Sequence, residues 1–283
     1  MNETYIQFKR KRELGEIITV TFQFIRNNYK PLLKSIIKNV GPLFLIFIAA
    51  IAYYTSAIAG SPFKAMQDSA ANFLIAMLVL FLALMLFYSA YYATILHYIK
   101  SYVENNGVVQ PQNIRTGVRQ NFLKLILLYV ITSVLTIAGF MFLVIPGIYI
   151  FVPLTLASTI LIIENRSISE SISYCFDLVK NHWWTTFGSL LVIYILVYVI
   201  GLIFQLPVLI YTVTKVFMSS QEGSIADPSS FQDWIFISLN TFATVMQYVL
   251  SGITIISISL IYYNLNEHKN LTGTYEAIDN LGN

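Results

Sequence analysis

The chain has 283 residues, of which 57% are apolar and only 11% carry a formal charge. Soluble domains are about 25% charged, so the composition excludes an ordinary water-soluble domain and predicts an integral membrane protein. We interpret the net charge of +3 as a topology signal, and no nucleic acid is expected as a partner. The single cysteine, Cys175, excludes an internal disulfide and a cysteine-based metal cluster.

Long windows without a charged residue or histidine predict the number of membrane crossings. A helix needs about 20 apolar residues to cross the hydrocarbon core, and the alternation typical of barrel strands is missing. The third window is long enough for two helices, so we expect six transmembrane helices in an all-α integral membrane protein. The windows are Asn39–Phe63, Ser69–Leu96, Leu125–Ile163, Trp183–Thr214 and Trp234–Asn266.

The first element is an amphipathic segment, Leu14–Leu33, that recurs later in the chain. It aligns without a gap on Ile168–Phe187, so that Arg26 meets Lys180, and a weaker copy around Arg119 precedes the third span. We therefore expect three parallel repeats of a cytoplasmic amphipathic helix followed by a transmembrane hairpin. The repeats cover residues 13–99, 110–163 and 167–266, and a polar cytoplasmic tail of weak order covers 267–283.

Basic and aromatic residues near the ends of these amphipathic segments are expected at the level of the lipid headgroups. The alternative is that the segments pack on the cytoplasmic rim of the bundle, because both arrangements bury the same apolar face. The candidates for contact with anionic headgroups are Arg26, Lys30, Arg119, Lys124, Lys180, His182, Trp183 and Trp184.

The second span carries small residues at every seventh position: Ser69, Ala76, Ala83 and Ala90. Small residues at this spacing let a neighbouring helix approach closely, so they predict a helix-packing face. Five tyrosines between positions 88 and 102 follow it and predict an aromatic belt at the membrane surface.

The middle of the chain gives the clearest turn and helix signals. Pro146 and Gly147 interrupt the third window and predict the turn between two helices. Ser167 and Glu170 have the spacing of a capping box, which predicts the start of a helix. We expect that helix to end where Asn181 adopts the left-handed conformation.

The last two spans combine a proline with a polar stripe. Pro207 is expected to break the fifth span. The stripe predicts an uncharged polar groove for a solute or amphiphile. The alternative is hydrogen bonding between helices, worth about 0.6–2 kcal/mol per bond. The groove candidates are Gln205, Thr241, Thr244, Gln247, Ser251 and Thr254.

Basic residues set the expected orientation. With six crossings, every Lys and Arg except Lys64 and Lys215 falls on the side of the two termini. Cytoplasmic segments carry the excess of Lys and Arg, so both termini are expected in the cytoplasm. The outward segment Lys215–Asp233 is acidic and is a candidate contact for a partner.

Chemical motifs are absent from the sequence. The windows hold no ionisable residue, no two histidines have metal-ligand spacing, and neither a P-loop nor a nucleophile elbow occurs. We expect no catalytic, cofactor-binding or metal site. The nearest titratable set is Glu164, Glu170, Asp177 and His182, whose acids helix capping and surface charge pairs explain more simply.

A family resemblance covers Phe142–Gly188. Its motifs are Leu-Val-Ile-Pro-Gly-Ile-Tyr at 143–149, the helix led by Glu170, Lys-Asn-His-Trp-Trp at 180–184 and Phe-Gly at 187–188. The segment resembles a broad group of bacterial six-helix membrane proteins that are similar to the membrane domain fused to some glycerophosphodiester phosphodiesterases.

The resemblance implies a bacterial inner membrane and a link to lipids. It implies no catalysis, because the catalytic residues of those phosphodiesterases belong to a separate soluble domain. The chain departs from the pattern at Phe151–Pro153, where such proteins often carry a basic residue, and at Cys175, where they often have serine.

Three functions are compatible with these features. The first is a non-catalytic membrane module that acts as a partner subunit, scaffold or lipid-organising protein, in contact with anionic lipids and a membrane-protein partner or a second copy. The second is a transport or lipid-handling protein with an uncharged cavity lined by the sixth helix. The third is a membrane enzyme that acts on lipids.

Overall fold

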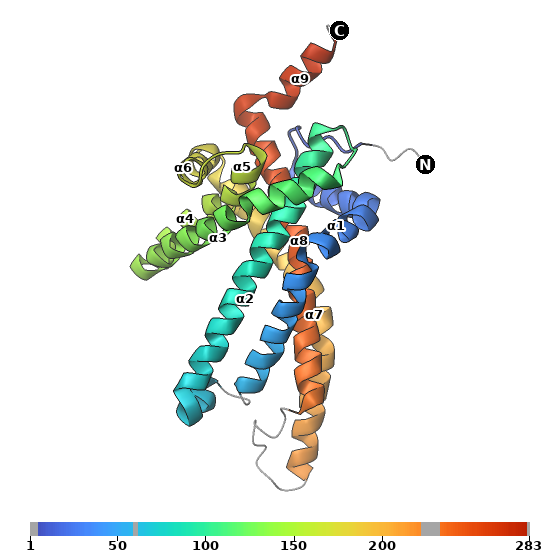
Figure 1. Cartoon of the computed structure of the whole chain (residues 1–283). Coiled ribbons are helices and arrows are strands. Elements are labelled where there is room, and N and C mark those ends of the chain that lie inside the picture. Colours follow the sequence, from blue (N-terminus) through green and yellow to red (C-terminus); the bar gives the residue numbers. More distant parts are fainter. Residues whose placement is uncertain (1–4, 59–61, 222–232, 282–283) are drawn as a thin grey trace. The chain divides into compact units, whose positions relative to one another are not determined.

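The computed structural model describes residues 5–58, 62–221 and 233–281. Every regular element within these ranges is an α-helix (Figure 1). The helices are α1 (Leu14–Ala57), α2 (Pro62–Glu104), α3 (Pro111–Phe142), α4 (Val144–Leu154), α5 (Ala157–Ile163), α6 (Ile168–Val179), α7 (Trp183–Gln221), α8 (Trp234–Asn270) and α9 (Thr272–Leu281).

Six helices are long and apolar enough to cross a membrane, as the charge-free windows predicted. They are α1, α2 from Ser69 onward, α3, the pair α4 and α5 taken together, α7 and α8. The chain is therefore a multi-pass membrane protein.

The chain forms two compact units. Unit 1 consists of Met1–Val40, Ser89–Ile195 and Gly252–Asn283, and unit 2 consists of Gly41–Tyr88 and Leu196–Ser251. Each of α1, α2, α7 and α8 therefore contributes one stretch to each unit, whereas α3 to α6 belong wholly to unit 1.

The core of unit 1 is an aromatic cluster built on the segment that precedes α1. Phe8 is fully buried, and its ring meets Phe24, Tyr102 and Tyr263 edge-on at centroid distances of 5.3, 6.0 and 5.5 Å. Tyr98, also buried, donates a hydrogen bond to Asn28 at 3.1 Å. The expected aromatic belt is therefore wrong for Tyr98 and Tyr102, because these rings fill a core between helices instead of lying at a surface.

The hairpin of α3 and α4 shows how the proline signal acts. The break lies at Leu143, whose extended backbone (φ −169°, ψ 158°) separates the helices, and Pro146 and Gly147 lie inside the first turn of α4. The predicted turn at Pro146-Gly147 is thus wrong by a few residues. A proline in a helix interior clashes with the carbonyl four residues earlier, here that of Phe142, but it is tolerated in a first turn. For this reason α3 ends at Phe142.

The two glycines of this hairpin let α3 and α4 pack closely, side by side (Figure 1). A Cβ placed on Gly139 would lie 3.1 Å from the Cα of Gly147, and one on Gly147 would lie 2.5 Å from the Phe140 ring. The role of Gly147 is therefore close helix contact.

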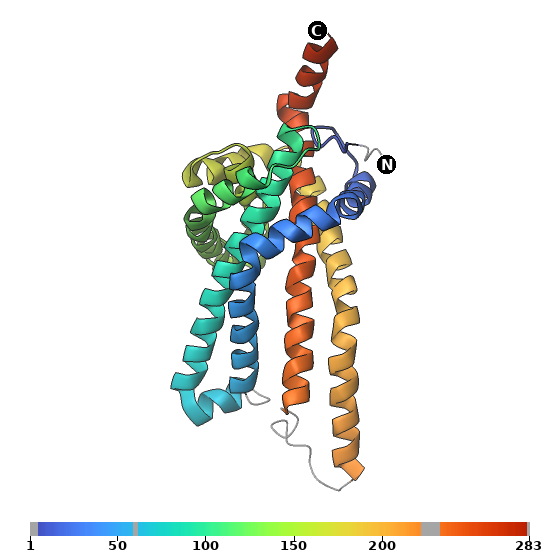
Figure 2. The ribbon, with the colours of Figure 1, turned by 45° about the vertical axis from the view of Figure 1, so that its right-hand side comes forward.

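Unit 2 is held mainly by apolar and small side chains. Phe47 is fully buried, stacks on Phe87 at 4.7 Å and meets Tyr248 edge-on at 4.9 Å. The second half of α7 lies beside the first half of α8 in both views (Figure 2). Gly201 gives Gln247 room there, since an added Cβ would lie 1.8 Å from the amide oxygen.

The small-residue stripe is buried at three of its four positions. Ala76 and Ala83 in unit 2 and Ala90 in unit 1 are almost completely buried. Ser69 differs, because its backbone is not helical (φ −161°, ψ 91°) and its hydroxyl accepts from the Asn72 amide at 3.4 Å. Ser69 therefore begins the straight part of α2 and is not part of the packing face.

Other sequence expectations need correction. Helix α7 runs through Pro207 without ending, which fits the tolerance of membrane helices for proline. The amphipathic segments of the first two expected repeats run on into α1 and α3, and the third forms a separate helix, α6. Of the outward segment, Lys215–Gln221 is helical, and residues 222–232 lie outside the described residues.

The C-terminal tail is helical over α9. The buried Glu267 carboxylate accepts hydrogen bonds from the Gly273 amide at 2.7 Å and the Thr274 amide at 3.0 Å, which caps the start of α9. Lys9 forms an ion pair with Glu276 on α9. These contacts tie the tail to the N-terminal segment within unit 1.

Candidate functional site

A pocket of about 560 Å³ in unit 1 gathers four of the predicted headgroup residues. It lies where α4 meets the turn between α6 and α7. We call it the aromatic pocket, and its lining residues are Ile145, Ile148, Tyr149, Lys180, Asn181, His182, Trp183, Trp184, Thr185 and Phe187. One side therefore offers isoleucines and aromatic rings, and the other offers a lysine, an asparagine and a histidine.

A proline in α4 explains how Trp183 is positioned. Pro153 has no amide hydrogen, so the carbonyl of Tyr149, four residues earlier, lacks its usual helical donor. The Trp183 indole donates to this carbonyl at 3.3 Å and stacks on the Tyr149 ring at 5.6 Å. The gap that Pro153 leaves in the helix thus becomes a fixed anchor for the wall of the pocket.

The aromatic wall continues along the first turns of α7. Trp183 stacks on Phe187 at 5.3 Å and meets Trp184 edge-on at 4.8 Å. Trp184 is 77% exposed. A large exposed indole beside the half-buried Trp183 is typical of side chains that lie among lipid headgroups.

The polar side of the pocket is cationic. Lys180 is exposed, and the half-buried His182 ring lies 4.9 Å from the ring of His268 on α8. The Lys180 ammonium attracts a negatively charged group such as a phosphate, and an imidazole nitrogen can donate a hydrogen bond to it. The described residues that line this pocket include no carboxylate to oppose that attraction.

The helix that leads into the pocket begins as the sequence predicted. The Ser167 hydroxyl accepts from the Glu170 amide at 3.3 Å, and the Glu170 carboxylate accepts from the Ser167 amide at 2.9 Å. These hydrogen bonds hold the pKa of Glu170 below its usual value. The capping box is therefore confirmed.

The end of this helix differs from the prediction. Asn181 is not in the left-handed region, which among described residues other than glycine is occupied by Asn106, Asn165 and Leu271. Helix α6 ends through Lys180, which keeps a helical backbone, and the His182 amide donates to the Val179 carbonyl at 2.8 Å. The strained residue, Asn165, lies at the other end of α6, just before its capping serine.

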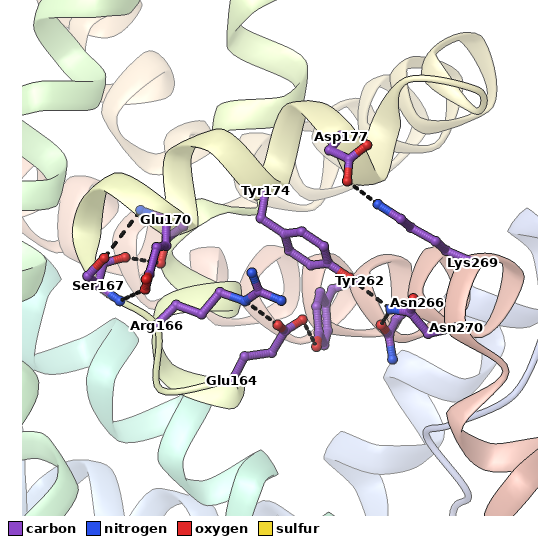
Figure 3. Close-up of polar contacts among 11 residues, drawn as sticks. Glu164, Arg166, Ser167, Glu170, Tyr174, Asp177, Tyr262, Asn266, Lys269 and Asn270 are labelled. Atoms are coloured by element: carbon purple, nitrogen blue, oxygen red, sulfur yellow. Dashed lines mark hydrogen bonds and ion pairs between the residues drawn. The ribbon is translucent and has the colours of Figure 1, made fainter.

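A polar network holds α6 against α8 (Figure 3). Tyr262 donates to Glu164 at 2.7 Å, Arg166 pairs with Glu164, and Lys269 pairs with Asp177. We call this set the α6–α8 network, and its members are Glu164, Arg166, Tyr174, Asp177, Tyr262, Asn266, Lys269 and Asn270.

Tyr174 lies at the centre of the α6–α8 network. The Arg166 guanidinium lies 3.8 Å and the Lys269 ammonium 4.8 Å from the centroid of its ring, and its hydroxyl accepts from Asn270 at 2.8 Å. Cations over an aromatic ring are attracted by its negative face. Because α6 leads directly into the turn at 180–182, this network positions the polar side of the aromatic pocket.

The acids considered for an enzyme therefore have structural partners. Glu164 pairs across the network, Glu170 caps α6, and Asp177 binds Lys269, whose hydrogen bond lowers the pKa of the Asp177 carboxyl. His182 lies apart from them in the aromatic pocket. A cavity of about 380 Å³ is lined partly by the network, and its cations Lys9, Lys100 and Arg166 bind Glu276, the Ile162 carbonyl and Glu164.

The other predicted residues lie elsewhere. Arg26 and Lys30 on α1 and Arg119 and Lys124 on α3 are exposed, and none of them lines the aromatic pocket. Cys175, in α6, is buried, and burial raises the pKa of its thiol to about 12.

The residues of the polar stripe line neither the aromatic pocket nor the cavity of about 380 Å³ at the α6–α8 network. Gln247 packs on Gly201, Ser251 donates to the carbonyl of Tyr248 at 2.6 Å, and Thr241 and Thr254 are buried. Thr244 and Gln205 are half-buried. Gln247 contacts a neighbouring helix at Gly201, and the alternative to a groove, hydrogen bonding between helices, stays a prediction.

Sequence reasoning missed two isoleucines of the aromatic pocket and one neighbour of His182. Ile145 and Ile148 belong to a hairpin whose partner could not be assigned from periodicity, and His268, which contacts the His182 ring, comes from a helix far along the chain. A signal for Trp183 was present, because Pro153 leaves one carbonyl of α4 free at a predictable position. No known protein family, no curated protein and no solved structure matches this chain.

Proposed function

We propose that this multi-pass membrane protein is a non-catalytic module that holds anionic phospholipid in the aromatic pocket, on the cytoplasmic side of a bacterial inner membrane. One observation carries the proposal: Lys180, His182, Trp183 and Trp184, each expected at a headgroup from the sequence alone, line a single pocket with an apolar side. A phosphate at Lys180 and His182 leaves an acyl chain free to lie along Ile145 and Phe187.

The pocket suits lipid better than a soluble anion. Exposed indoles favour the headgroup region, and an isolated phosphate would make no use of the isoleucines. The orientation follows from the basic residues, which lie almost wholly in unit 1. The predicted resemblance to membrane domains of lipid phosphodiesterases points the same way. The three-repeat arrangement remains part of this proposal, with α6 as its interfacial helix.

Lipid retention tests the proposal. The full chain is purified in mild detergent, mixed with phosphatidylglycerol or phosphatidylcholine of identical acyl chains, and examined by native mass spectrometry. We expect preferential retention of phosphatidylglycerol. A lysine near an anionic lipid surface contributes about 1 kcal/mol, so Lys180→Gln together with His182→Gln should lower that preference about fivefold.

A matched control separates the pocket from general charge. Lys124→Gln removes an exposed cation of α3 that does not line the pocket, and it should leave the preference unchanged. Equal retention of the two lipids by the unsubstituted chain would contradict the proposal. So would an equal loss from the control.

The proposed orientation has its own test. Cys175 is buried, so it adds little background to labelling by a maleimide that cannot cross membranes. Gln67→Cys should react in intact cells, and Asp279→Cys should react only after permeabilisation. The reverse pattern would place the termini outside.

A further inference from the structure

A second cavity in unit 1, of about 350 Å³, is lined by hydroxyl groups and by no charged residue. Five of its residues are serines or threonines: Thr132, Ser133 and Thr136 from α3, Thr155 after α4, and Ser158 from α5. It shares no lining residue with the aromatic pocket. Such a concentration of hydroxyls is unexpected in helices that are otherwise apolar enough to cross a membrane.

The hydroxyl groups of the cavity can still form hydrogen bonds with a ligand. The Thr155 hydroxyl donates to the Val152 carbonyl at 2.7 Å, and that of Thr132 donates to the Tyr129 carbonyl at 3.3 Å. A hydroxyl has one hydrogen and two lone pairs, so each still accepts. Within the described part of the chain, the Ser133, Thr136 and Ser158 hydroxyls make no hydrogen bond.

Among the five serines and threonines of the cavity, Ser158 gives the strongest evidence that a ligand binds there. Its side chain is 4% exposed, it lies in a helix whose other residues from Ala157 to Ile162 are also buried, and it lines the cavity. Its hydroxyl oxygen is not itself fully enclosed, so a molecule in the cavity can reach it. A ligand hydroxyl inserted here would both donate to these oxygens and accept from them.

The lining residues carry no charge, and this limits the class of ligand that can bind in the cavity. No lining residue could neutralise a phosphate or an ammonium group, and an unpaired charge is expensive to bury. The rim includes Ile137 and Tyr194, which are 59% and 38% exposed on helices of membrane-spanning character. An acyl chain can lie along such a rim, and a free sugar would gain nothing from it.

We infer that this cavity binds the uncharged, hydroxyl-rich headgroup of a neutral glycolipid, with the acyl chains along the rim at Ile137 and Tyr194. The site differs from the aromatic pocket in chemistry, because it selects hydroxyl groups where the aromatic pocket selects a negative charge. The two sites together would let one chain hold two classes of lipid.

The test uses the full chain in a zwitterionic detergent, so that no detergent sugar competes. Monoglucosyl diacylglycerol, phosphatidylcholine of the same acyl chains and methyl glucoside are compared by native mass spectrometry. We expect the glycolipid to be retained at least tenfold more than phosphatidylcholine, and methyl glucoside not to be retained. Thr136→Val with Ser158→Ala removes two hydroxyls with little change in shape and should lower glycolipid retention about tenfold.

Controls make the result decisive. Thr214→Val removes a hydroxyl of α7 that does not line the cavity and should change nothing. An unchanged thermal unfolding midpoint of the double variant shows that the fold is intact, and Thr136→Ser, which keeps the hydroxyl, should retain glycolipid if the double variant unfolds. Equal retention of glycolipid and phosphatidylcholine, binding of methyl glucoside, or an unaffected double variant would each overturn the inference.

Discussion

Unit 1 and unit 2 draw on the same four long helices but are held together by different chemistry. Unit 1 contains every Lys and Arg except Lys64 and Lys215, a buried arginine, and the α6–α8 network. Unit 2 is held by ring stacking around Phe47 and by contacts such as Gly201 with Gln247. One set of helices can therefore use polar contacts in one stretch and close apolar packing in another.

We expect the surrounding medium to differ between stretches of helix inside a membrane and stretches outside it. Lipid tails are as apolar as leucine, so helices inside a bilayer gain little from hiding apolar surface and associate through packing and hydrogen bonds. Where a chain meets water, burial of apolar surface contributes about 25 cal/mol per Å². Arg12 is an example of polar packing in unit 1. Its guanidinium is buried and donates to the Phe8 carbonyl at 2.8 Å, and desolvation by burial lowers its pKa.

Replacing either of two fully buried phenylalanines, Phe8 or Phe47, should cause the greatest loss of folding stability. Phe8→Ala in unit 1 should cost about 3–5 kcal/mol, because the ring leaves a core that water reaches on unfolding. Phe47→Ala in unit 2 should cost about half as much, because its loss is packing alone. Unfolding in detergent followed by circular dichroism measures both. Equal losses would break the proposed contrast between the units.

Alanine substitutions at two glycines should cause the next largest loss of folding stability. Gly117→Ala in unit 1 places a Cβ 2.3 Å from the buried His97 ring, which Asn121 holds through a 3.1 Å hydrogen bond. Overpacking of this kind costs about 1–3 kcal/mol. Gly201→Ala in unit 2 meets a flexible amide and should cost less.

The glycine comparison has a control within α1. Nothing lies within 4 Å of a Cβ added at Gly15, so Gly15→Ala should raise stability by up to about 1 kcal/mol, through helix propensity alone. Thermal unfolding midpoints rank the three variants. A destabilised Gly15→Ala protein would show that alanine harms these helices for another reason.

A smaller effect concerns the start of α6. Ser167→Ala removes the capping box and should cost about 1 kcal/mol, seen as faster proteolysis of the 164–182 segment. Ser167→Asp keeps an acceptor at the cap and serves as the control. Retention of phosphatidylglycerol should fall along with the order of α6, because α6 positions Lys180.

The effects expected to be weakest come from two carboxylates, the exposed Asp177 in unit 1 and the half-buried Asp233 in unit 2. Hydrogen bonds from Lys269 lower the pKa of Asp177, and those from Tyr211 and the Phe236 amide lower the pKa of Asp233 to about 2. A lowered pKa stabilises the fold above the ordinary Asp value near 3.9, and this contribution is lost as the pH falls through the folded value. Asp177→Asn and Asp233→Asn should therefore each reduce the acid sensitivity of unfolding between about pH 4 and 2.

The outcome of these acid titrations is read against salt. Exposed pairs are screened by ions, so the loss from Asp177→Asn should shrink at high salt. Asp233 also pairs with Lys215 at 3.1 Å, but its contribution should persist better, because the Tyr211 hydroxyl and the Phe236 amide are uncharged donors. A reversed salt dependence would contradict these assignments.

Local signals in the sequence predicted the helices better than their ends. The charge-free windows identified all six candidate spans, and Ser167 with Glu170 gave the start of α6. Pro146 was placed in a turn, whereas its effect is felt four residues earlier, at Phe142. The prediction that Asn181 ends α6 in the left-handed conformation is wrong, because a left-handed residue is only one of several ways to end a helix.

Contacts between distant segments were beyond a single sequence. The heptad spacing of Ala76 and Ala83 showed that they pack but not against which helix. The headgroup residues of α6 and α7 were found from composition, yet the isoleucines opposite them come from α4, whose path depends on the break at Leu143. The hydroxyl-lined cavity takes its lining residues from six helices, so the periodicity of a single helix does not predict it.

The indole held by the free carbonyl of α4 has an optical consequence. The chain has three tryptophans, and Trp183 and Trp184 both lie at the aromatic pocket while differing in exposure. Intrinsic fluorescence is thus dominated by one place in the molecule. Acyl chains brominated at successive carbons would quench Trp184 and Trp183 to different extents, so the protein carries its own depth gauge for whatever amphiphile settles there.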